Sequence, residues 1–234
     1  MKLSVIICVY NELETILEVL NRVRLVNLGP QWEKEIIVVD NCSTDGTREL
    51  LQAITGDGVQ VIYQHANLGK GNSVRKAIPL CTGDFTITQD ADLEYHPRQY
   101  AVLLRKAMDN DLDVVYGSRV LSGKRYHYYT INYWAVRVLT WLTNILFGAC
   151  YTDVATNYKL VRTSILKSLH LTCSGFDLDF ELSNKLAQAT NKIAEVDIDY
   201  VPRTYRQGKK IGAWDGMRAL SVILRDGIAN RLGY

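Results

Sequence analysis

Three carboxylates that follow one short apolar segment could hold a divalent metal ion. The segment ends at residue 89, and Asp90, Asp92 and Glu94 come next in the run Q-D-A-D-L-E. Alternation along a strand would place Asp90 and Asp92 on one side, so that both leave the same sheet edge. Close negative charges favour a hard cation with oxygen ligands between them. The alternative is an acidic turn that caps the following helix, since D-x-D also occurs by chance.

Strands and helices alternate in the half of the chain that carries these carboxylates. Five apolar runs predict buried strands, at residues 3–9, 35–40, 59–63, 85–89 and 113–117. Helices joined by short loops between them predict a doubly wound, mostly parallel α/β sheet, whose ligands lie beyond the carboxyl ends of the strands. Polar residues gather at those ends: Glu12, Asp40, Gly69-Lys70-Gly71, Asp90, Asp92 and Gly117-Ser118-Arg119.

The second half of the chain begins with an apolar helix, expected over residues 131–149. Its charge-free run from residue 138 to residue 152 is shorter than the ~20 residues that a membrane span needs. The helix therefore either lies amphipathically in a membrane interface or packs on the protein's own core. A helix over 177–190, a strand over 194–201 and a closing helix from Trp214 are expected after it.

Charge and cysteine content narrow the class of protein. There is no acid between Asp113 and Asp153, and residues 200–234 hold seven Lys and Arg against two acids. This basic half predicts an anionic partner, such as a nucleotide, a lipid phosphate or a membrane surface, unless it is a solvated basic face. The five cysteines are scattered without a C-x-x-C motif, which favours free thiols in a reducing compartment and argues against a zinc site.

Six segments together resemble a known family. They are V-I-I-C-V-Y-N-E, V-V-D-N-C-S-T-D-G-T, N-L-G-K-G, Q-D-A-D-L-E, V-Y-G-S-R and R-T-Y-R-Q-G-K-K-I-G-A-W-D-G. In this order they resemble the inverting GT-A glycosyltransferases of family 2, in the dolichyl- or polyprenyl-phosphate mannose (or glucose) synthase-like branch. The likeness covers nearly the whole chain. It implies one GT-A (Rossmann-like) domain over residues 1–234, with a nucleotide-sugar-binding half at 1–119 and an acceptor-binding half at 120–234.

The resemblance also implies substrates, a cofactor and a location. The donor would be a nucleotide-diphosphate sugar, GDP-mannose or UDP-glucose, and the cofactor Mg²⁺ or Mn²⁺. The acceptor would be a polyprenyl phosphate or another lipid, reached by a protein bound peripherally to the cytoplasmic face of the membrane. No nucleic acid is expected as a partner.

On the donor side, the resemblance assigns roles position by position. The Val9-Tyr10-Asn11-Glu12 turn and Asp40 would hold the base and ribose. Asp90 would lie near the ribose and metal, Asp92 would ligate the metal, and Glu94 would be a third ligand where the synthases often have Gln. Three further residues match the loop that closes over the donor phosphates: Arg203, Arg206 and Lys209. Lys70 lies in the glycine turn beside the nucleotide.

On the acceptor side, Arg119 and Arg137 match arginines that hold the acceptor phosphate. Two departures bear on this assignment. Synthases of this kind often carry C-terminal transmembrane helices, which this sequence lacks. The G-F-D-L-D-F-E segment also resembles the place where other family 2 enzymes put an acidic general base.

Two acceptor chemistries stay open at this point. A lipid phosphate is ionised at pH 7 and needs only cations to position it, whereas a hydroxyl group needs a carboxylate such as Asp179 or Asp177 to take its proton. Those two acids could instead stabilise the start of their helix. We expect Asp92, Arg119 and Asp179 to be the catalytic residues.

Other classes of protein fit the sequence less well. A sugar nucleotidyltransferase would show G-x-G-x-R after the first strand, and a dehydrogenase G-x-G-x-x-G; neither is present. A non-catalytic nucleotide-binding module remains as a further alternative.

Overall fold

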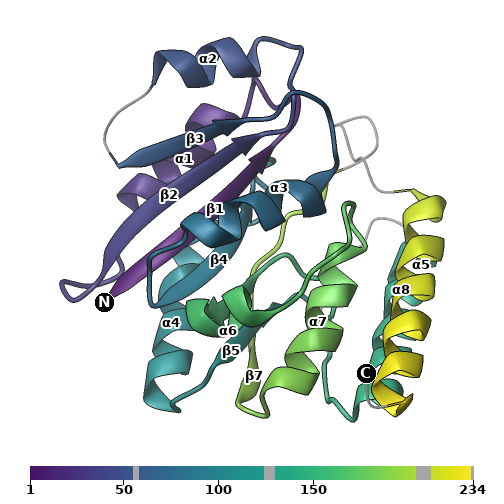
Figure 1. The fold of residues 1–234 in the computed structure, drawn as a ribbon. Coiled ribbons are helices and arrows are strands. Elements are labelled where there is room, and N and C mark those ends of the chain that lie inside the picture. Colours follow the sequence, from purple (N-terminus) through teal and green to yellow (C-terminus); the bar gives the residue numbers. More distant parts are fainter. Residues whose placement is uncertain (55–57, 124–129, 204–211, 233–234) are drawn as a thin grey trace.

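A seven-stranded sheet forms the centre of the computed structural model, which describes residues 1–54, 58–123, 130–203 and 212–232 (Figure 1). The spatial order of the strands is β3-β2-β1-β4-β6-β5-β7. All neighbouring pairs are parallel except those of β6, which runs antiparallel to β4 and β5. The strands are β1 (Lys2–Val9), β2 (Glu33–Asp40), β3 (Val59–Tyr63), β4 (Phe85–Asp90), β5 (Val114–Ser118), β6 (Lys159–Arg162) and β7 (Ile193–Asp197).

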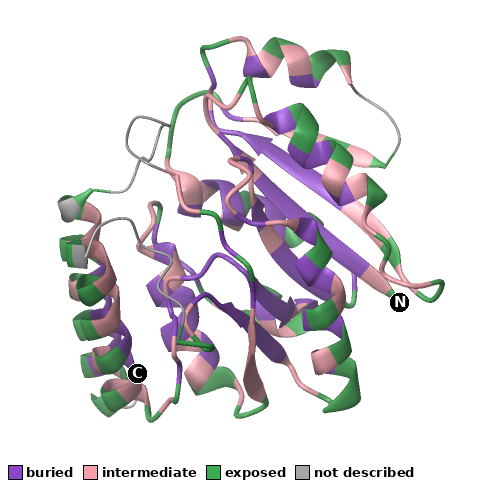
Figure 2. Cartoon of the chain, turned by 180° about the vertical axis from the view of Figure 1, so that it is seen from behind, coloured by how far each residue is buried: buried purple, intermediate pink, exposed green. Residues whose placement is uncertain are grey.

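Helices cover both faces of this sheet, which explains why the central strands are apolar on both sides. Leu3, Val5 and Ile7 of β1 face one core with α1 and α4, whereas Ile6 faces the other with α3 and α7. The strands are accordingly the most buried elements (Figure 2). The helices are α1 (Ile16–Leu25), α2 (Thr47–Ala53), α3 (Lys70–Ala77), α4 (Tyr100–Asp109), α5 (Thr130–Phe147), α6 (Thr163–Ser168), α7 (Leu178–Ala189) and α8 (Ala213–Leu232), with 3-10 turns η1 (Ile78–Leu80) and η2 (Pro97–Gln99).

The predicted mostly parallel α/β fold is confirmed, with three local differences. The antiparallel direction of strand β6 was not predicted, because the sequence of a four-residue strand carries no sign of its direction. Helix α6 has six residues, too few for an apolar period to show. The predicted strand over 194–201 ends earlier, at Asp197.

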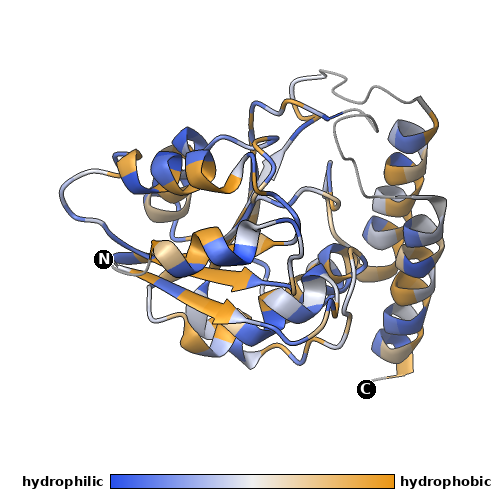
Figure 3. Cartoon of the chain, turned by 90° about the horizontal axis from the view of Figure 1, so that it is seen from above, coloured by the Kyte–Doolittle hydropathy of each residue, from blue (hydrophilic) through white to orange (hydrophobic). Residues whose placement is uncertain are grey.

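The two long helices α5 and α8 lie side by side at one flank of the molecule (Figures 1 and 3). Part of the apolar surface of α5 is internal, because Leu139 is buried and Leu142 and Leu146 pack against the core that includes α7 and α8. Another part is exposed, including Trp134 and Trp141. In the described residues, no helix combines the length and the apolar character needed to span a membrane.

The carboxylate of Glu35 links β2 to β1 and to Thr82 near the amino ends of the strands. This is the end of the sheet opposite the edge where ligands are expected. Glu35 pairs with Lys2 (2.6 Å) and accepts hydrogen bonds from Ser4 Oγ and Thr82 Oγ1, the latter at 2.6 Å. Burial opposes ionisation, but these hydrogen bonds lower the pKa of Glu35 to about 2. A depressed carboxyl pKa stabilises the folded state above the unfolded pKa of about 4.3, and this stabilisation is lost as the pH falls towards 2.

We therefore expect Glu35→Gln to lower the free energy of unfolding at pH 7 by roughly 1–2 kcal/mol, because a charged acceptor of several hydrogen bonds is replaced by a neutral one. The difference from the wild type should shrink below about pH 4.3. Urea unfolding at pH 7, 4 and 3 measures it, with the exposed Glu33→Gln as control. A difference that stays constant over this pH range would contradict the assignment.

Candidate active site

A cavity of about 1160 Å³ opens at the carboxyl ends of β1 and β4. One end is lined by charged side chains, and the other by apolar residues of α5 and α8 such as Trp134, Val138 and Met217. Most of the predicted site residues line it: Val9, Tyr10, Glu12, Lys70, Asp90, Asp92, Glu94, Arg119, Asp179 and Arg203.

Asp40 and Arg137, which the structure describes, are not part of this lining. Asp40 is fully buried; its Oδ2 pairs with Arg48 Nε at 2.6 Å and its Oδ1 accepts from the Ser43 amide. Arg137 donates from Nη1 to the Thr152 carbonyl at 2.9 Å. Arg206 and Lys209 lie outside the described residues. The roles of all the predicted site residues, these four included, stay predictions.

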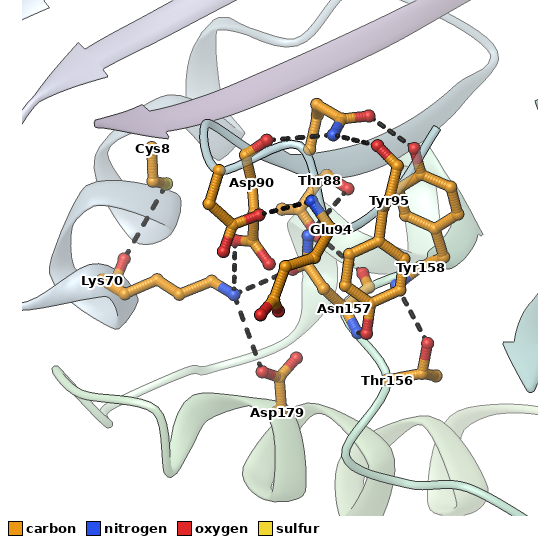
Figure 4. Close-up of polar contacts among 12 residues, drawn as sticks. Cys8, Lys70, Thr88, Asp90, Glu94, Tyr95, Thr156, Asn157, Tyr158 and Asp179 are labelled. Atoms are coloured by element: carbon orange, nitrogen blue, oxygen red, sulfur yellow. Dashed lines mark hydrogen bonds and ion pairs between the residues drawn. The ribbon is translucent and has the colours of Figure 1, made fainter. Parts of the chain in front are cut away.

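The ammonium group of Lys70 joins the two sides of the cavity (Figure 4). Its Nζ lies 2.8 Å from Asp90 Oδ1 and 3.9 Å from Asp179 Oδ2, and it donates to Asn157 Oδ1 at 3.0 Å. Burial alone would lower the pKa of Lys70, but Asp90 and Asp179 raise it above its usual value. Lys70 is therefore a fixed positive charge at neutral pH.

A second lysine lies on the far side of Asp179. Lys159, at the start of β6, places Nζ 2.9 Å from Asp179 Oδ1 and is almost completely buried. Burial lowers the pKa of Lys159 although Asp179 opposes this effect. Sequence reasoning missed both Lys159 and Asn157; the available signal was a lysine that opens the otherwise apolar run K-L-V.

Three carboxylates at the charged end share one guanidinium group. Arg203 approaches Glu12 Oε2 at 3.1 Å, Asp92 Oδ2 at 2.9 Å and Glu94 Oε1 at 3.9 Å. Its main-chain amide also donates to Glu94 Oε1 at 2.7 Å. Arg203 is far in the sequence from both Glu12 and the turn that carries Asp92 and Glu94, so the pairing with Arg203 could not be read from spacing.

The carboxylate oxygens of Asp92, Glu94 and Glu12 are ligands of the kind that a divalent cation prefers, although here they pair with Arg203. Burial, with repulsion from Asp90 and Glu94, raises the pKa of Asp92 to about 7 despite Arg203. Such a rise marks carboxylates with too little positive charge around them, which a hard cation would supply. Within the ranges that the structure describes, no three His, Cys, Asp or Glu side chains are grouped as a metal site.

The two aspartates do not leave the sheet as strand alternation predicts. β4 ends at Asp90, whose side chain turns to Lys70, and Asp92 lies in the turn that follows and faces Arg203. Leu93 in this turn has a φ of 63°, a left-handed conformation that leucine rarely adopts. The local backbone, and not the strand period, therefore sets where each carboxylate points.

The side chain of Gln89 holds the 90–95 turn through hydrogen bonds to its main chain. Its Oε1 accepts hydrogen bonds from the hydroxyls of Tyr100 (2.6 Å) and Tyr158 (2.5 Å). Its Nε2 donates to the carbonyls of Asp90 and Tyr95 (Figure 4). A buried amide whose donors and acceptor are all paired holds the turn in one geometry.

Arg119 is held by a buried acid. Its Nε and Nη2 reach the two oxygens of Asp153 at 2.7 and 2.8 Å, and its guanidinium lies over the ring of Tyr200. Burial opposes the charge on Asp153, but Arg119 keeps the pKa of that carboxyl below its usual value. The sequence did carry a signal for Asp153, since it is the only acid between Asp113 and Asp177.

The glycines of N-L-G-K-G pack against the main chain at residues 173–175. A Cβ atom at Gly69 would collide with the carbonyl oxygen of Ser174, and one at Gly71 would lie 2.7 Å from that of Cys173. The Asn72 amide donates to the Ser174 carbonyl at 3.1 Å. Close approach of two main chains explains these glycines, and it places Lys70 opposite Asp179.

Comparison with solved structures identifies proteins of the same fold, and comparison with sequences identifies the family. A glucosyl-3-phosphoglycerate synthase from Mycobacterium tuberculosis, solved with Mn²⁺, UDP and glucosyl-3-phosphoglycerate, superposes with a TM-score of 0.69 at 20% identity, over 99% of this chain and 80% of that one. The fold is thus that of a glycosyltransferase.

The chain belongs to glycosyl transferase family 2, whose family model matches residues 4–169. An undecaprenyl-phosphate mannosyltransferase from Micrococcus luteus is 28% identical over 243 residues, which cover 99% of this chain and 96% of that protein. A dolichol-phosphate mannosyltransferase from Pyrococcus furiosus is 28% identical over 220 residues. The matched residues cover 91% of this chain and 60% of the Pyrococcus protein.

We expect Asp92→Ala to lower sugar transfer by at least about 100-fold, because the metal and diphosphate would lose a ligand. The melting temperature should stay constant or rise, since removal of Asp92 relieves repulsion among buried carboxylates. Turnover and differential scanning fluorimetry measure the two effects, with the exposed Asp109→Ala as control. A large drop in melting temperature would show instead that Asp92 serves the fold.

Proposed function

We propose that this family 2 enzyme is an inverting hexosyltransferase that moves mannose or glucose from a nucleotide-diphosphate sugar to a polyprenyl phosphate at the membrane surface. One observation carries the proposal: a single cavity has carboxylates and fixed cations at one end and an apolar wall of α5 and α8 at the other. A charged donor and a lipid phosphate together need both environments. The Micrococcus and Pyrococcus relatives bear names of this activity.

The donor fits the charged end. Val9, Tyr10 and Glu12 line the cavity beside the glycine turn and are the proposed contacts of the nucleoside. Mg²⁺ or Mn²⁺, when bound by Asp92 with Asp90 or Glu94, would neutralise the leaving diphosphate. The presence of Mn²⁺ and UDP in the Mycobacterium tuberculosis structure supports this use of the site. GDP-mannose and UDP-glucose both remain candidate donors.

The state of Asp179 favours an acceptor that is already ionised. Both of its oxygens face ammonium groups, those of Lys159 and Lys70. Two ion pairs within the protein would compete with a substrate hydroxyl group for this carboxylate. A phosphate oxygen needs no such base, only cations that hold it in line with the sugar carbon. Arg119 at the cavity wall is the proposed cation for this task.

The apolar flank would face the lipid. Exposed apolar side chains on α5 follow a helical period, and the neighbouring helix α8 carries exposed apolar side chains as well. They are Ile131, Trp134, Val138, Trp141 and Ile145 of α5, and Trp214, Met217, Leu224, Ile228 and Leu232 of α8. The exposed Arg218, Arg225 and Arg231 lie on α8 among them. Tryptophans beside arginines suit the anionic headgroup region, and we place this face on the cytoplasmic leaflet.

Transfer to a short-chain polyprenyl phosphate, measured with GDP-mannose and UDP-glucose in the presence of Mn²⁺, tests the function. We expect an inverted product from one of these donors, and Asp179→Asn should keep turnover within about tenfold of the wild type. A base that takes a proton in the reaction contributes about 10²–10⁴-fold. A loss of that size would favour the alternative, in which the enzyme glycosylates a hydroxyl of a lipid or glycan.

Sedimentation with phosphatidylglycerol vesicles tests the membrane face. The double variant Trp141→Ser, Ile228→Ser should bind vesicles at least about tenfold more weakly, because both exposed side chains would otherwise enter the interface. Neither residue lines the cavity, so turnover of a short-chain acceptor in detergent should not change. Leu25→Ser on α1 is the control, since Leu25 is also an exposed apolar residue but lies on a helix away from α5 and α8 (Figure 1). Unchanged vesicle binding of the double variant would contradict the assignment.

A further inference from the structure

One turn, residues 151–153, contacts both arginines that are assigned to the acceptor phosphate. Asp153 pairs with Arg119 through both carboxylate oxygens, and the Thr152 carbonyl accepts from Arg137 at 2.9 Å. This turn belongs to no helix or strand. The positions of the two guanidinium groups therefore depend on what holds the turn.

The carboxylate of Glu195 holds it. The Thr152 amide donates to both oxygens of Glu195, at 2.9 and 3.0 Å, and the Thr152 hydroxyl donates to Oε2 at 2.7 Å. The Asp153 amide adds a longer contact of 3.4 Å to Oε1. Glu195 lies on β7, directly opposite Tyr116 of β5, so the sheet fixes where its side chain begins.

We propose that Glu195 is a positioning residue, whose carboxylate fixes the 151–153 turn and through it places Arg119 and Arg137 for the acceptor phosphate. The inference rests on the proposed function, because it takes these two arginines as acceptor contacts. Glu195 does not itself line the cavity, so it acts through the turn and not on a substrate.

The donors around Glu195 explain why a carboxylate is needed there. Two main-chain amides and one hydroxyl converge on it, and a carboxylate can accept from all of them because it has no hydrogen to donate. A glutamine would turn an NH₂ group towards at least one of these donors. The turn would then move away from β7, and its carbonyl and its acid would move with it.

The 151–153 turn, which Glu195 holds, is also bonded to helix α5. The element contacts of α5 are mainly with α8 and α7, and the hydrogen bond from Arg137 to Thr152 ties the first half of the helix to the 151–153 turn. The Thr152 hydroxyl also lies 2.7 Å from that of Ser118, next to Arg119 in the chain. Asn144 of α5 also bonds to the Tyr151 main chain, so Glu195 acts with it to set the distance between an arginine on the sheet edge and one on a peripheral helix.

The test is the steady-state kinetics of Glu195→Gln with a short-chain polyprenyl phosphate. We expect the acceptor KM to rise about tenfold, while the donor KM and the thermal shift with nucleotide and Mn²⁺ stay at wild-type values. Glu35→Gln is the matched control, since it removes a carboxylate that accepts from an amide and hydroxyls at the opposite end of the sheet. An unchanged acceptor KM in Glu195→Gln, or an equal rise in Glu35→Gln, would overturn the inference.

A double-mutant cycle separates positioning from general stability. If Glu195 acts through the turn, Glu195→Gln should raise the acceptor KM less in an Arg137→Ala background than in the wild type. Full additivity would overturn the route through Arg137. Should Glu195→Gln fold poorly, Thr152→Val removes one of the same hydrogen bonds and should raise the acceptor KM in the same direction.

The two possible failures are distinguishable. A wild-type enzyme that transfers no sugar to polyprenyl phosphate would overturn the proposed function. If the wild type does transfer, and Arg137→Ala raises the acceptor KM but Glu195→Gln does not, the inference about Glu195 alone is wrong.

Discussion

The buried ammonium group of Lys70 is the charge on which the arrangement of the cavity depends. It contacts Asp90 at the end of β4 and Asp179 at the start of α7, and Lys159 pairs with the other oxygen of Asp179. Without these cations, two desolvated carboxylates would face each other across the cavity, which is strongly unfavourable. The ion pairs therefore allow acidic side chains from separate segments of the chain to converge in one cavity.

Much of the fold could be predicted from the sequence, because parallel strands buried on both faces read as uninterrupted apolar runs. The turns that carry Glu12, Lys70 and Asp90 were placed correctly for the same reason, since the carboxyl ends of such strands share one edge. The partners of these residues could not be predicted. Pairing of Arg203 with Glu12, or of Lys159 with Asp179, depends on tertiary packing that brings distant turns together.

The long apolar helix shows why amphipathic patterns alone leave alternatives open. Along α5, Leu139, Leu142 and Leu146 meet the protein core, whereas Trp134 and Trp141 point outward. The apolar surface of α5 is wider than one neighbouring helix can cover. Its sequence was therefore equally consistent with a helix packed on the core and with a helix in a membrane interface. Only the position of α8 beside α5 shows which part of that surface remains uncovered.

The glycine turn at 69–71 has a consequence for how the enzyme can diversify. The main chain of this turn packs directly against the main chain of Cys173 and Ser174, and the atoms nearest to both glycines are main-chain atoms. The spacing between these two segments is thus set by their main chains. Substitutions elsewhere in the cavity wall can alter which donor or acceptor fits without altering that spacing. A methyl group at either glycine would force the two segments apart and so change the cavity for every substrate alike.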